Sequence, residues 1–342
     1  MAERGRRKVV GRGERVLPGV WRLRLPLPWP GIPHGNAWAL AAGDGIVLVD
    51  TGIHEPGSFA HLERALDEVG LRLDLVRLLV CTHAHSDHYG QAQTIVERTG
   101  CELWMHPAWE HARVLAADPD EAIEKRITAA VRNGLPAEPV RRYAEGARSR
   151  GSGIAGIVPP DRDLVPGVTV ETDLGPWSVV ETPGHAPSHV CLYQPAHRLL
   201  ISGDHLLGRV SLYFEAGFTP DPVGEYLESL NVVDDLDMRL CLPGHGRTFT
   251  EVSGHVNANR EAIAGGLAGC LEALEAGPQT AFEVVGSVHE GEEISPLHAN
   301  LWVQETRSYL HHLEVVGDVT RLPAESEGEA DRWALARQAT GG

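Results

Sequence analysis

The amino-acid sequence predicts an α/β protein with strands and helices in layers, and three observations lead to this fold class. A continuous apolar run covers residues 75–81, as in a strand that is buried on both faces. A polar cluster, a helix-like segment at 91–99 and a second strand-like run at 102–105 follow it. Short strand-like runs recur as far as residue 242, and 342 residues suffice for one large domain or two ordinary ones.

The N-terminal part predicts a tail, a strand, a hairpin and a helix. Residues 1–16 are basic and lack apolar periodicity, so we expect a flexible tail. Alternation from Val20 predicts a strand, which we expect the proline-rich run at 25–33 to end. The elements expected next are a hairpin of residues 37–42 and 45–50 about Gly43, and a helix over 59–69 that ends at Gly70.

The later segments predict a long helical insertion at 107–165, further strands, and a helical end of the chain. The expected strands are 168–172, 177–181, 190–193, 199–202 and 240–242, with a helix over 222–237. From Asn257 the expected helices are 257–276, 280–288 and 297–316. We therefore expect one domain over 17–254, which contains the insertion, and a mostly helical C-terminal region over 255–342.

Charge and composition exclude several classes of protein. The chain has 30 Lys and Arg against 47 Asp and Glu, a formal net charge of −17, which argues against a main surface that binds phosphates. No apolar run reaches the ~18–20 residues that span a bilayer, and the start lacks the apolar core of a secretory signal. The five cysteines are far apart without a C-x-x-C pair, so we expect a cytoplasmic protein without a disulfide framework.

The segment directly after the apolar strand carries metal-ligand side chains in an H-x-H-x-D-H pattern. His83 and His85 are two residues apart, so an extended turn can present both imidazoles to one ion. Asp87 and His88 are adjacent and can reach a second ion a few Å away. Mixed nitrogen and oxygen donors suit zinc, and a site with spare coordination positions suits catalysis rather than structure.

Three later motifs each place one ligand-type residue at the end of a predicted strand, beside a glycine. These residues are His185 in Thr-Pro-Gly-His, Asp204 in Ser-Gly-Asp-His and His245 in Pro-Gly-His-Gly. Glycine permits tight turns and close approach of the backbone. Because strand ends in α/β layers converge on one edge, we expect these side chains to join the H-x-H-x-D-H residues there.

Together with Asp50 in Val-Asp-Thr-Gly, these motifs resemble the metallo-β-lactamase superfamily, in its glyoxalase II-like branch with two metal ions. The resemblance implies a four-layered αββα sandwich with the site at one edge of the two sheets. It implies that His83, His85 and His185 hold the first ion, that Asp87, His88 and His245 hold the second, and that Asp204 bridges them. It also implies that Asp50 orients a ligand histidine and that Asp87 takes up a proton during turnover.

The implied chemistry is hydrolysis. Two ions, expected as Zn²⁺ with Fe or Mn as alternatives, would lower the pKa of a bridging water from ~15.7 toward neutrality. The metal-bridged hydroxide would attack a carbonyl or phosphorus centre. We expect Asp87 to serve catalysis directly and Asp50 to serve it by orienting a ligand histidine. We expect no organic cofactor.

The substrate is the open question at this level. The C-terminal region resembles the winged-helix-like appendage of β-lactamase-like proteins of the type called β-lactamase-like protein 2; some such proteins are RNA endonucleases, and related ones are thioesterases. Residues 255–342 carry 5 Arg and no Lys against 14 Asp and Glu, a sum of −9, whereas a nucleic-acid-binding winged helix is normally basic. We therefore favour a small-molecule acyl substrate, namely a thioester, ester or lactone, with no membrane partner.

Three alternatives stay open. A metal-dependent RNA or phosphodiester endonuclease would be supported by a basic groove beside the metals. A non-hydrolytic binding protein or an oxidoreductase on the same scaffold is the second alternative. The third concerns the appendages: the insertion at 107–165 is expected to roof the site, or to be a surface insertion, and the C-terminal region could serve packing or formation of a homodimer.

Overall fold

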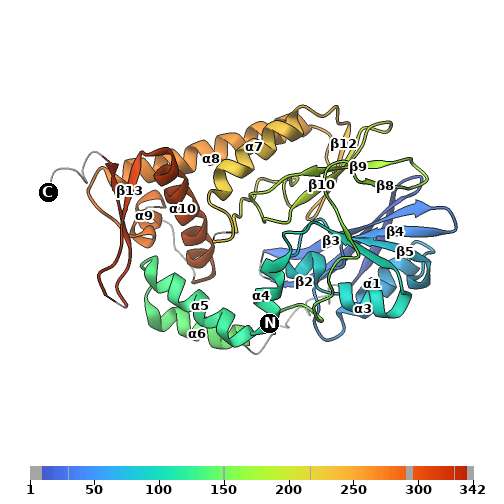
Figure 1. Ribbon diagram of the computed structural model, residues 1–342, viewed down its shortest axis with the longest axis horizontal. Helices are drawn as coiled ribbons and strands as arrows, with labels where there is room; N and C mark the ends of the chain where they lie inside the picture. The colour runs from blue at the N-terminus through green and yellow to red at the C-terminus, as the bar shows by residue number, and fades with distance from the viewer. Residues whose placement is uncertain are drawn as a thin grey trace, which may run out of the picture.

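Two β-sheets packed face to face form a sandwich on one side of the protein in the computed structural model, at the right in Figure 1. The structure describes residues 10–29, 31–148, 151–215, 217–289, 296–326 and 328–336. The first sheet contains, in spatial order, β1 (Arg12–Leu17), β2 (Val20–Trp29), β3 (Ile32–Ala42), β4 (Gly45–Val49), β5 (Val76–Val80), β6 (Glu102–Met105) and β7 (Arg162–Asp163). The second contains β12 (Leu240–Pro243), β11 (Leu199–Gly203), β10 (Val190–Gln194), β9 (Trp177–Glu181) and β8 (Thr169–Val170).

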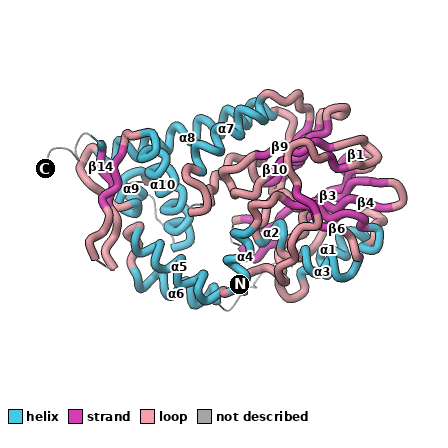
Figure 2. Tube along the Cα trace, in the orientation of Figure 1, coloured by secondary structure: helices cyan, strands magenta, loops and turns pink. Residues whose placement is uncertain are grey.

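Helices cover the outer face of each sheet. The first sheet is covered by α1 (Ser58–Asp67) and α3 (Ala92–Thr99), and the second by α7 (Pro222–Asp234) and α8 (Val252–Leu274) (Figure 2). Two short elements, η1 (Leu73–Leu75) and α2 (Ser86–Tyr89), flank β5. The fold is thus the four-layered αββα sandwich, which confirms the predicted fold class.

Alternation along β3 explains how the layers are held together. Trp38 and Leu40 point between the sheets, whereas Ala37 and Ala39 point toward the helices, as the two-residue period of a strand requires. Trp38 meets an inter-sheet core that includes Trp177 of β9, and both side chains are fully buried. Burying such side chains supplies the largest favourable contributions to folding.

The N-terminal segment differs from expectation in one respect. Arg12–Leu17 is a strand that pairs with β2, so the expected tail is wrong for residues 12–16, and residues 1–9 lie outside the described part. The sequence misleads because an edge strand needs hydrogen-bond partners more than apolar periodicity. The pairing continues only to Arg12 opposite Arg24.

The proline-rich run does not end β2, which continues through Pro26 and Pro28 to Trp29. Beyond Arg24 the strand has β3 on one side and no β1 on the other. A proline can be accommodated there because the missing N–H need not face a neighbouring strand. The prediction that residues 25–33 break the strand is therefore wrong for its first half.

The insertion contains α4 (Glu110–Ala117), α5 (Pro119–Arg132) and α6 (Ala137–Arg148). Its residues 151–158 run back along α2, where the Gly153 carbonyl accepts a hydrogen bond from His54 N–H at 2.8 Å. The far end of α5 lies against the C-terminal region, where Phe282 N–H donates to the Asn133 carbonyl at 2.9 Å. The insertion thus connects the metal-motif loop to the end of the chain.

The C-terminal region is helical, as predicted, and ends in a hairpin. It consists of α8, α9 (Ala281–Val288), α10 (Pro296–Val316), and the antiparallel strands β13 (Val319–Leu322) and β14 (Arg332–Leu335). Thr280 and Glu283 form a capping box that begins α9. The predicted boundary at 254/255 falls inside α8, and one apolar cluster joins the second sheet to α7, α8, α9 and α10.

In the part of the chain that the structure describes, no helix combines the length and the apolar character needed to cross a bilayer.

Candidate metal centre

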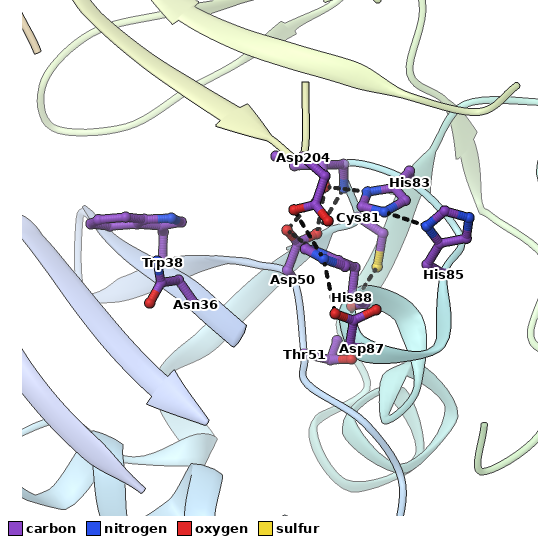
Figure 3. A network of polar contacts seen from close by, with 12 residues as sticks. Asn36, Trp38, Asp50, Thr51, Cys81, His83, His85, Asp87, His88 and Asp204 are labelled. Carbon is purple, nitrogen blue, oxygen red and sulfur yellow. Dashed lines mark hydrogen bonds and ion pairs between the residues drawn. The ribbon is translucent and has the colours of Figure 1, made fainter. Parts of the chain in front are cut away.

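Strand ends from both sheets bring the predicted ligands to one edge of the sandwich. Figure 3 labels His83, His85, Asp87, His88 and Asp204 of this set. His83, His85, Asp87 and His88 lie in the loop and short helix that follow β5. His185, Asp204 and His245 follow β9, β11 and β12 of the second sheet. The structure therefore brings together all the residues that the motifs assign to the two ions.

The ligand atoms fall into two groups that share Asp204. In the first group, Nδ1 of His85 lies 3.0 Å from Nε2 of His83 and 3.0 Å from Nε2 of His185. In the second, Nε2 of His245 lies 3.1 Å from Asp87 Oδ2. The carboxylate of Asp204 reaches both, at 3.7 Å from His185 Nε2 and 3.2 Å from His245 Nε2.

This geometry fits a pair of divalent ions. Two nitrogen donors at 2.0–2.1 Å from a tetrahedral zinc would be about 3.3 Å apart, close to the separations seen here. In addition, His88 Nε2 and Asp204 Oδ1 are buried without a hydrogen-bond partner, although they lie 3.4 Å apart. Buried polar atoms are rarely left unpaired, and a shared ion would satisfy both.

The second nitrogen of each ligand histidine has its own partner, which fixes the nitrogen that faces the cluster. For His88 the partner is the Asp50 carboxylate at 2.9 Å, and for His185 and His245 it is a backbone carbonyl, of Tyr213 and His34, at 3.1 Å. Such contacts orient the rings and set their tautomers. The remaining pairs are His83 Nδ1 with Thr82 Oγ1 at 3.0 Å and His85 Nε2 with Glu215 Oε2 at 3.2 Å.

Asp50 lies one step behind the ligands, where the resemblance puts it. Its backbone has a φ of 65°, a left-handed conformation that Asp adopts more readily than most residues. This turn at the end of β4 lets one oxygen accept the Thr82 N–H at 2.8 Å while the other faces His88. Asp50 thereby ties β4 to the loop after β5.

Glycine beside Asp204 is required by space. A Cβ at Gly244 would lie 2.2 Å from Asp204 Oδ1 and 2.8 Å from the His88 ring. No side chain fits there without moving a ligand. The Pro-Gly-His-Gly motif therefore packs its backbone against the Asp204 carboxylate.

Charge and burial favour the metal-binding protonation states of His83, His185 and Asp87. For His88 and His245, burial also favours the neutral ring, but nearby carboxylates outweigh it and raise the pKa. Burial lowers the pKa of His83 well below its ordinary value, and the neighbouring His88 lowers it further. Burial also lowers the pKa of His185 to about 3. Burial would raise the pKa of Asp87, but His88 and His245 outweigh it and hold that pKa below its usual range. Neutral imidazoles and ionised carboxylates are the forms that coordinate a divalent ion.

Sequence analysis missed a buried chain of polar residues behind His85. Glu215, in the loop between β11 and α7, contacts His85 and also lies 2.8 Å from Nδ1 of His111, which belongs to α4 of the insertion. The other ring nitrogen of His111 lies 2.8 Å from the Ser188 hydroxyl, which accepts the Ala84 N–H. No motif links these residues, because 130 positions separate His85 from Glu215.

The histidines adjacent to ligands have supporting contacts. His189 accepts the backbone N–H of Asp204 at 3.0 Å and pairs with the Thr182 hydroxyl at 2.7 Å. His205 is buried, with its ring 4.7 Å from that of Tyr226. His189 therefore supports Asp204, whereas both ring nitrogens of His205 are buried without a hydrogen-bond partner among the described residues.

Comparison with known families gives the same result as the geometry. Residues 30–245, more than half of the chain, match the family model described as the metallo-beta-lactamase superfamily. The chain belongs to the metallo-β-lactamase superfamily. It therefore shares the scaffold of a superfamily of metallo-hydrolases, and its His and Asp cluster has residues that could bind metal ions.

Several relatives are similar over most of the chain. A protein called probable metallo-hydrolase YqjP from Bacillus subtilis is 25% identical over 301 residues, which are 82% of this chain and 88% of that one. An atrochrysone carboxyl ACP thioesterase from Aspergillus chevalieri is 23% identical, over 94% of this chain and 88% of its own. A β-lactamase-like protein 2 homologue from Caenorhabditis elegans is 25% identical over 70% of this chain and 65% of its own.

Among solved structures, a β-lactamase domain protein from Burkholderia ambifaria has a TM-score of 0.79 with this chain. It is 28% identical, and the alignment covers 95% of this chain and 93% of that one. The similarity includes the C-terminal region as well as the sandwich, because residues 30–245 alone would not reach that coverage.

Proposed function

We propose that the protein is a dinuclear metal-dependent hydrolase that cleaves a thioester, ester or lactone. The observation that carries the proposal is the pair of ligand groups that share Asp204 at one sheet edge. Two bound divalent ions, which we propose to be zinc, would supply Lewis acidity and a water made acidic enough to ionise near neutral pH. A shared carboxylate suits this arrangement because it keeps two ions close together.

The residues of the chain hold and orient the reacting groups. Asp87, which is 6% exposed, is ionised beside His245 and can take a proton from water during turnover. Asp50 keeps His88 in one tautomer and so acts through orientation rather than contact. We therefore assign Asp87 a catalytic role and Asp50 a positioning role.

An aromatic wall beside the first ligand group favours an acyl substrate. Tyr213 is 37% exposed, and its ring lies 5.7 Å from His85 and 5.6 Å from His185. Phe218, which is 45% exposed, lies 5.7 Å from His111 in the same loop region. Exposed rings beside a reaction centre suit the apolar part of a substrate. The thioesterase named among the relatives is in line with this choice.

A metal-dependent RNA or phosphodiester endonuclease is the second candidate. Arginine side chains near His245, described in the next section, favour it. The acidic C-terminal region, at −9 over residues 255–342, opposes it, since a strand of nucleic acid needs phosphate contacts along its length. We therefore place it behind the acyl hydrolase.

The test measures metal content first and then activity. Purified protein is expected to hold two equivalents of divalent metal and to hydrolyse hexanoyl-CoA or a γ-lactone faster than bis(4-nitrophenyl) phosphate. D204N should lose activity by at least about 100-fold, more than changes one step removed from a metal usually cause. D44N, at an exposed turn on the far side of β4, is the matched control.

Two results would contradict the proposal. A folded protein that binds no divalent metal would overturn the hydrolase mechanism altogether. A two-metal protein that cleaves only the phosphodiester would replace the acyl hydrolase by the endonuclease.

A further inference from the structure

A basic cluster lies beside the second ligand group, in a chain whose net charge is −17. Arg22 and Arg24 are two residues apart on β2 and so share its inter-sheet face. Their cross-strand partners on β3 are Trp38 and Asn36, and the next pair is Pro26 with His34. Arg247, in the loop after β12 and two residues beyond the ligand His245, is close enough to Arg22 for the two charges to interact.

Backbone contacts hold this cluster against the site. Asn36 N–H donates to the Gly244 carbonyl at 2.7 Å, and His245 Nδ1 contacts the His34 carbonyl at 3.1 Å. Arg22 donates to the Gly246 carbonyl at 2.8 Å. The strand pair β2–β3 and the loop 243–247 therefore form one surface, and the second ligand group lies at its edge.

The positive charge of this surface is largely unpaired. Glu14 forms an ion pair with Arg22 at 2.5 Å, and Arg22 is thereby fixed in place. Arg24 and Arg247 have no ion pair or hydrogen bond with side chains in the described part of the protein. Three guanidinium groups against one carboxylate leave an excess charge of about +2 at ordinary pH, because arginine stays protonated.

Three buried polar atoms of the cluster also lack partners. Among the described residues, Nε of Arg22 and of Arg24 are donors without an acceptor, and Oδ1 of Asn36 is an acceptor without a donor. Arg22 is only 6% exposed. Buried donors that face no acceptor are uncommon in folded proteins, and they mark places where a ligand or water completes the hydrogen bonding. This second observation is independent of the net charge.

His34 adds a hydrogen-bonding side chain to the cluster. It is two residues from Asn36 on β3 and so lies on the same face of that strand, opposite Pro26. Its imidazole can form a hydrogen bond with a ligand bound at this edge.

We propose that Arg24 and Arg247, supported by Arg22 and His34, form an anion subsite that binds a phosphate group on the leaving-group side of the substrate. The inference rests on the proposed acyl hydrolase and names its substrate class, an acyl thioester of a phosphate-bearing thiol. A phosphate monoester carries about −1.5 to −2 charges, which matches the excess of the cluster, and guanidinium groups bind phosphate through paired hydrogen bonds.

The two sides of the site then give the substrate a direction. The aromatic side chains Tyr213 and Phe218 lie by the first ligand group, whereas the arginines lie by His245 of the second. The acyl chain would contact the aromatic side and the phosphate-bearing thiol would extend over the basic side. The thioester carbonyl would lie between the two ligand groups.

The test compares two hexanoyl thioesters that differ in the leaving thiol, hexanoyl-CoA and the uncharged N-acetylcysteamine thioester. R24Q and R247Q are each expected to lower kcat/KM for hexanoyl-CoA about tenfold, the loss typical of one charge-assisted hydrogen bond. Neither should change kcat/KM for the uncharged thioester by more than about twofold. R77Q, at the opposite end of the sheet on β5, removes the same charge and should affect neither substrate.

A binding measurement makes the subsite testable without turnover. S-methyl-CoA has the phosphates of CoA but no free thiol to bind a metal, and its Kd is measured by calorimetry. The Kd should increase about tenfold in R24Q and in R247Q. Added salt should weaken binding more steeply in wild type than in the variants. Two further substrates identify the leaving group. The hexanoyl thioester of glutathione distinguishes a carboxylate-bearing thiol from a phosphate-bearing one. The hexanoyl thioester of a phosphopantetheine carrier protein distinguishes CoA from a protein-bound phosphopantetheine arm.

Distinct results separate the subsite from the proposed function. Equal losses on both thioesters, or an unchanged Kd for S-methyl-CoA, would overturn the subsite while the hydrolase stands. If wild type cleaves neither thioester, the thioesterase form of the proposed function fails, and the Kd values alone decide the subsite. Arginine-dependent binding of a short RNA, without binding of S-methyl-CoA, would mean that the occupant is nucleic acid and the proposal is wrong.

Discussion

Replacing Glu215 tests whether the buried chain behind His85 supports the metal centre. The carboxylate is 8% exposed and contacts two imidazoles, at 3.2 Å from His85 Nε2 and 2.8 Å from His111 Nδ1. In Glu215→Ala both imidazoles lose their partner. Both imidazoles contact the same oxygen, Oε2, so in Glu215→Gln the amide oxygen can take that place, although it lacks the negative charge.

The expected magnitude follows from these contacts. Removing a carboxylate that orients a metal-ligand histidine typically weakens metal binding about 10–100-fold, or about 1.4–2.7 kcal/mol. We place Glu215→Ala near the upper end because it leaves two buried imidazoles without an acceptor. Glu215→Gln should lie near the lower end, since its shape and the shared acceptor oxygen are retained and only the charge is lost.

The assay is zinc competition against a chromophoric chelator, with the absorption spectrum of the cobalt(II) form as a second measurement. The spectrum reports the coordination around the first ion. It should therefore change in Glu215→Ala even if that variant has no measurable activity. Glu228→Gln, an exposed position on α7, is the control. Unchanged affinity in Glu215→Ala would refute the supporting role. If wild type binds three equivalents of metal and Glu215→Ala binds only two, then His85, His111 and Glu215 bind an ion themselves.

Three further predictions concern protons and packing. Burial lowers the pKa of His88 and of His245, but Asp204 outweighs it and raises both, the pKa of His245 to about 10. Metal binding at pH 7 must therefore displace protons from these rings. Calorimetry in two buffers should detect the release of more than one proton, and zinc affinity should fall as pH decreases. Burial lowers the pKa of His205 to about 3 from 6.5, so its contribution to stability is complete above pH 6.5 and is lost as pH falls toward 3. The free energy of unfolding should therefore differ between pH 7.5 and pH 5.5, and about 1.4 kcal/mol of that difference should come from His205. Urea unfolding of His205→Gln at the two pH values should show that this part is absent. Trp177→Ala in the inter-sheet core should lower the free energy of unfolding by about 3–5 kcal/mol, whereas a change of the exposed Val315 should alter it by less than about 0.5 kcal/mol in the same experiment.

The sequence predicts the residues of the ligand cluster well because each one is marked by local chemistry. His185, Asp204 and His245 stand beside glycines at strand ends, and the fold brings strand ends to one edge. The helices at 280–288 and 297–316 are likewise marked by local periodicity, and the structure has them within one residue at each boundary.

What the sequence does not predict depends on partners far away along the chain. Glu215 and His111 have no motif of their own, and only the fold places them behind His85. The strand at Arg12–Leu17 forms because β2 offers it a hydrogen-bonded edge, which no local pattern records. Arg24 contributes to the net charge like any other arginine, and only the pairing of β2 with β3 places it near His245.

The apolar cluster that joins the second sheet to the C-terminal helices has a consequence for cooperativity. Leu200 of β11, Val223 of α7, Ile263 of α8 and Leu310 of α10 belong to the same buried cluster. A fragment that stops at residue 254 would expose this surface of the sandwich to water and lose the matching free energy of burial. The two regions named from sequence therefore cannot melt independently, and the chain from the first sheet to the last helix should unfold in a single transition.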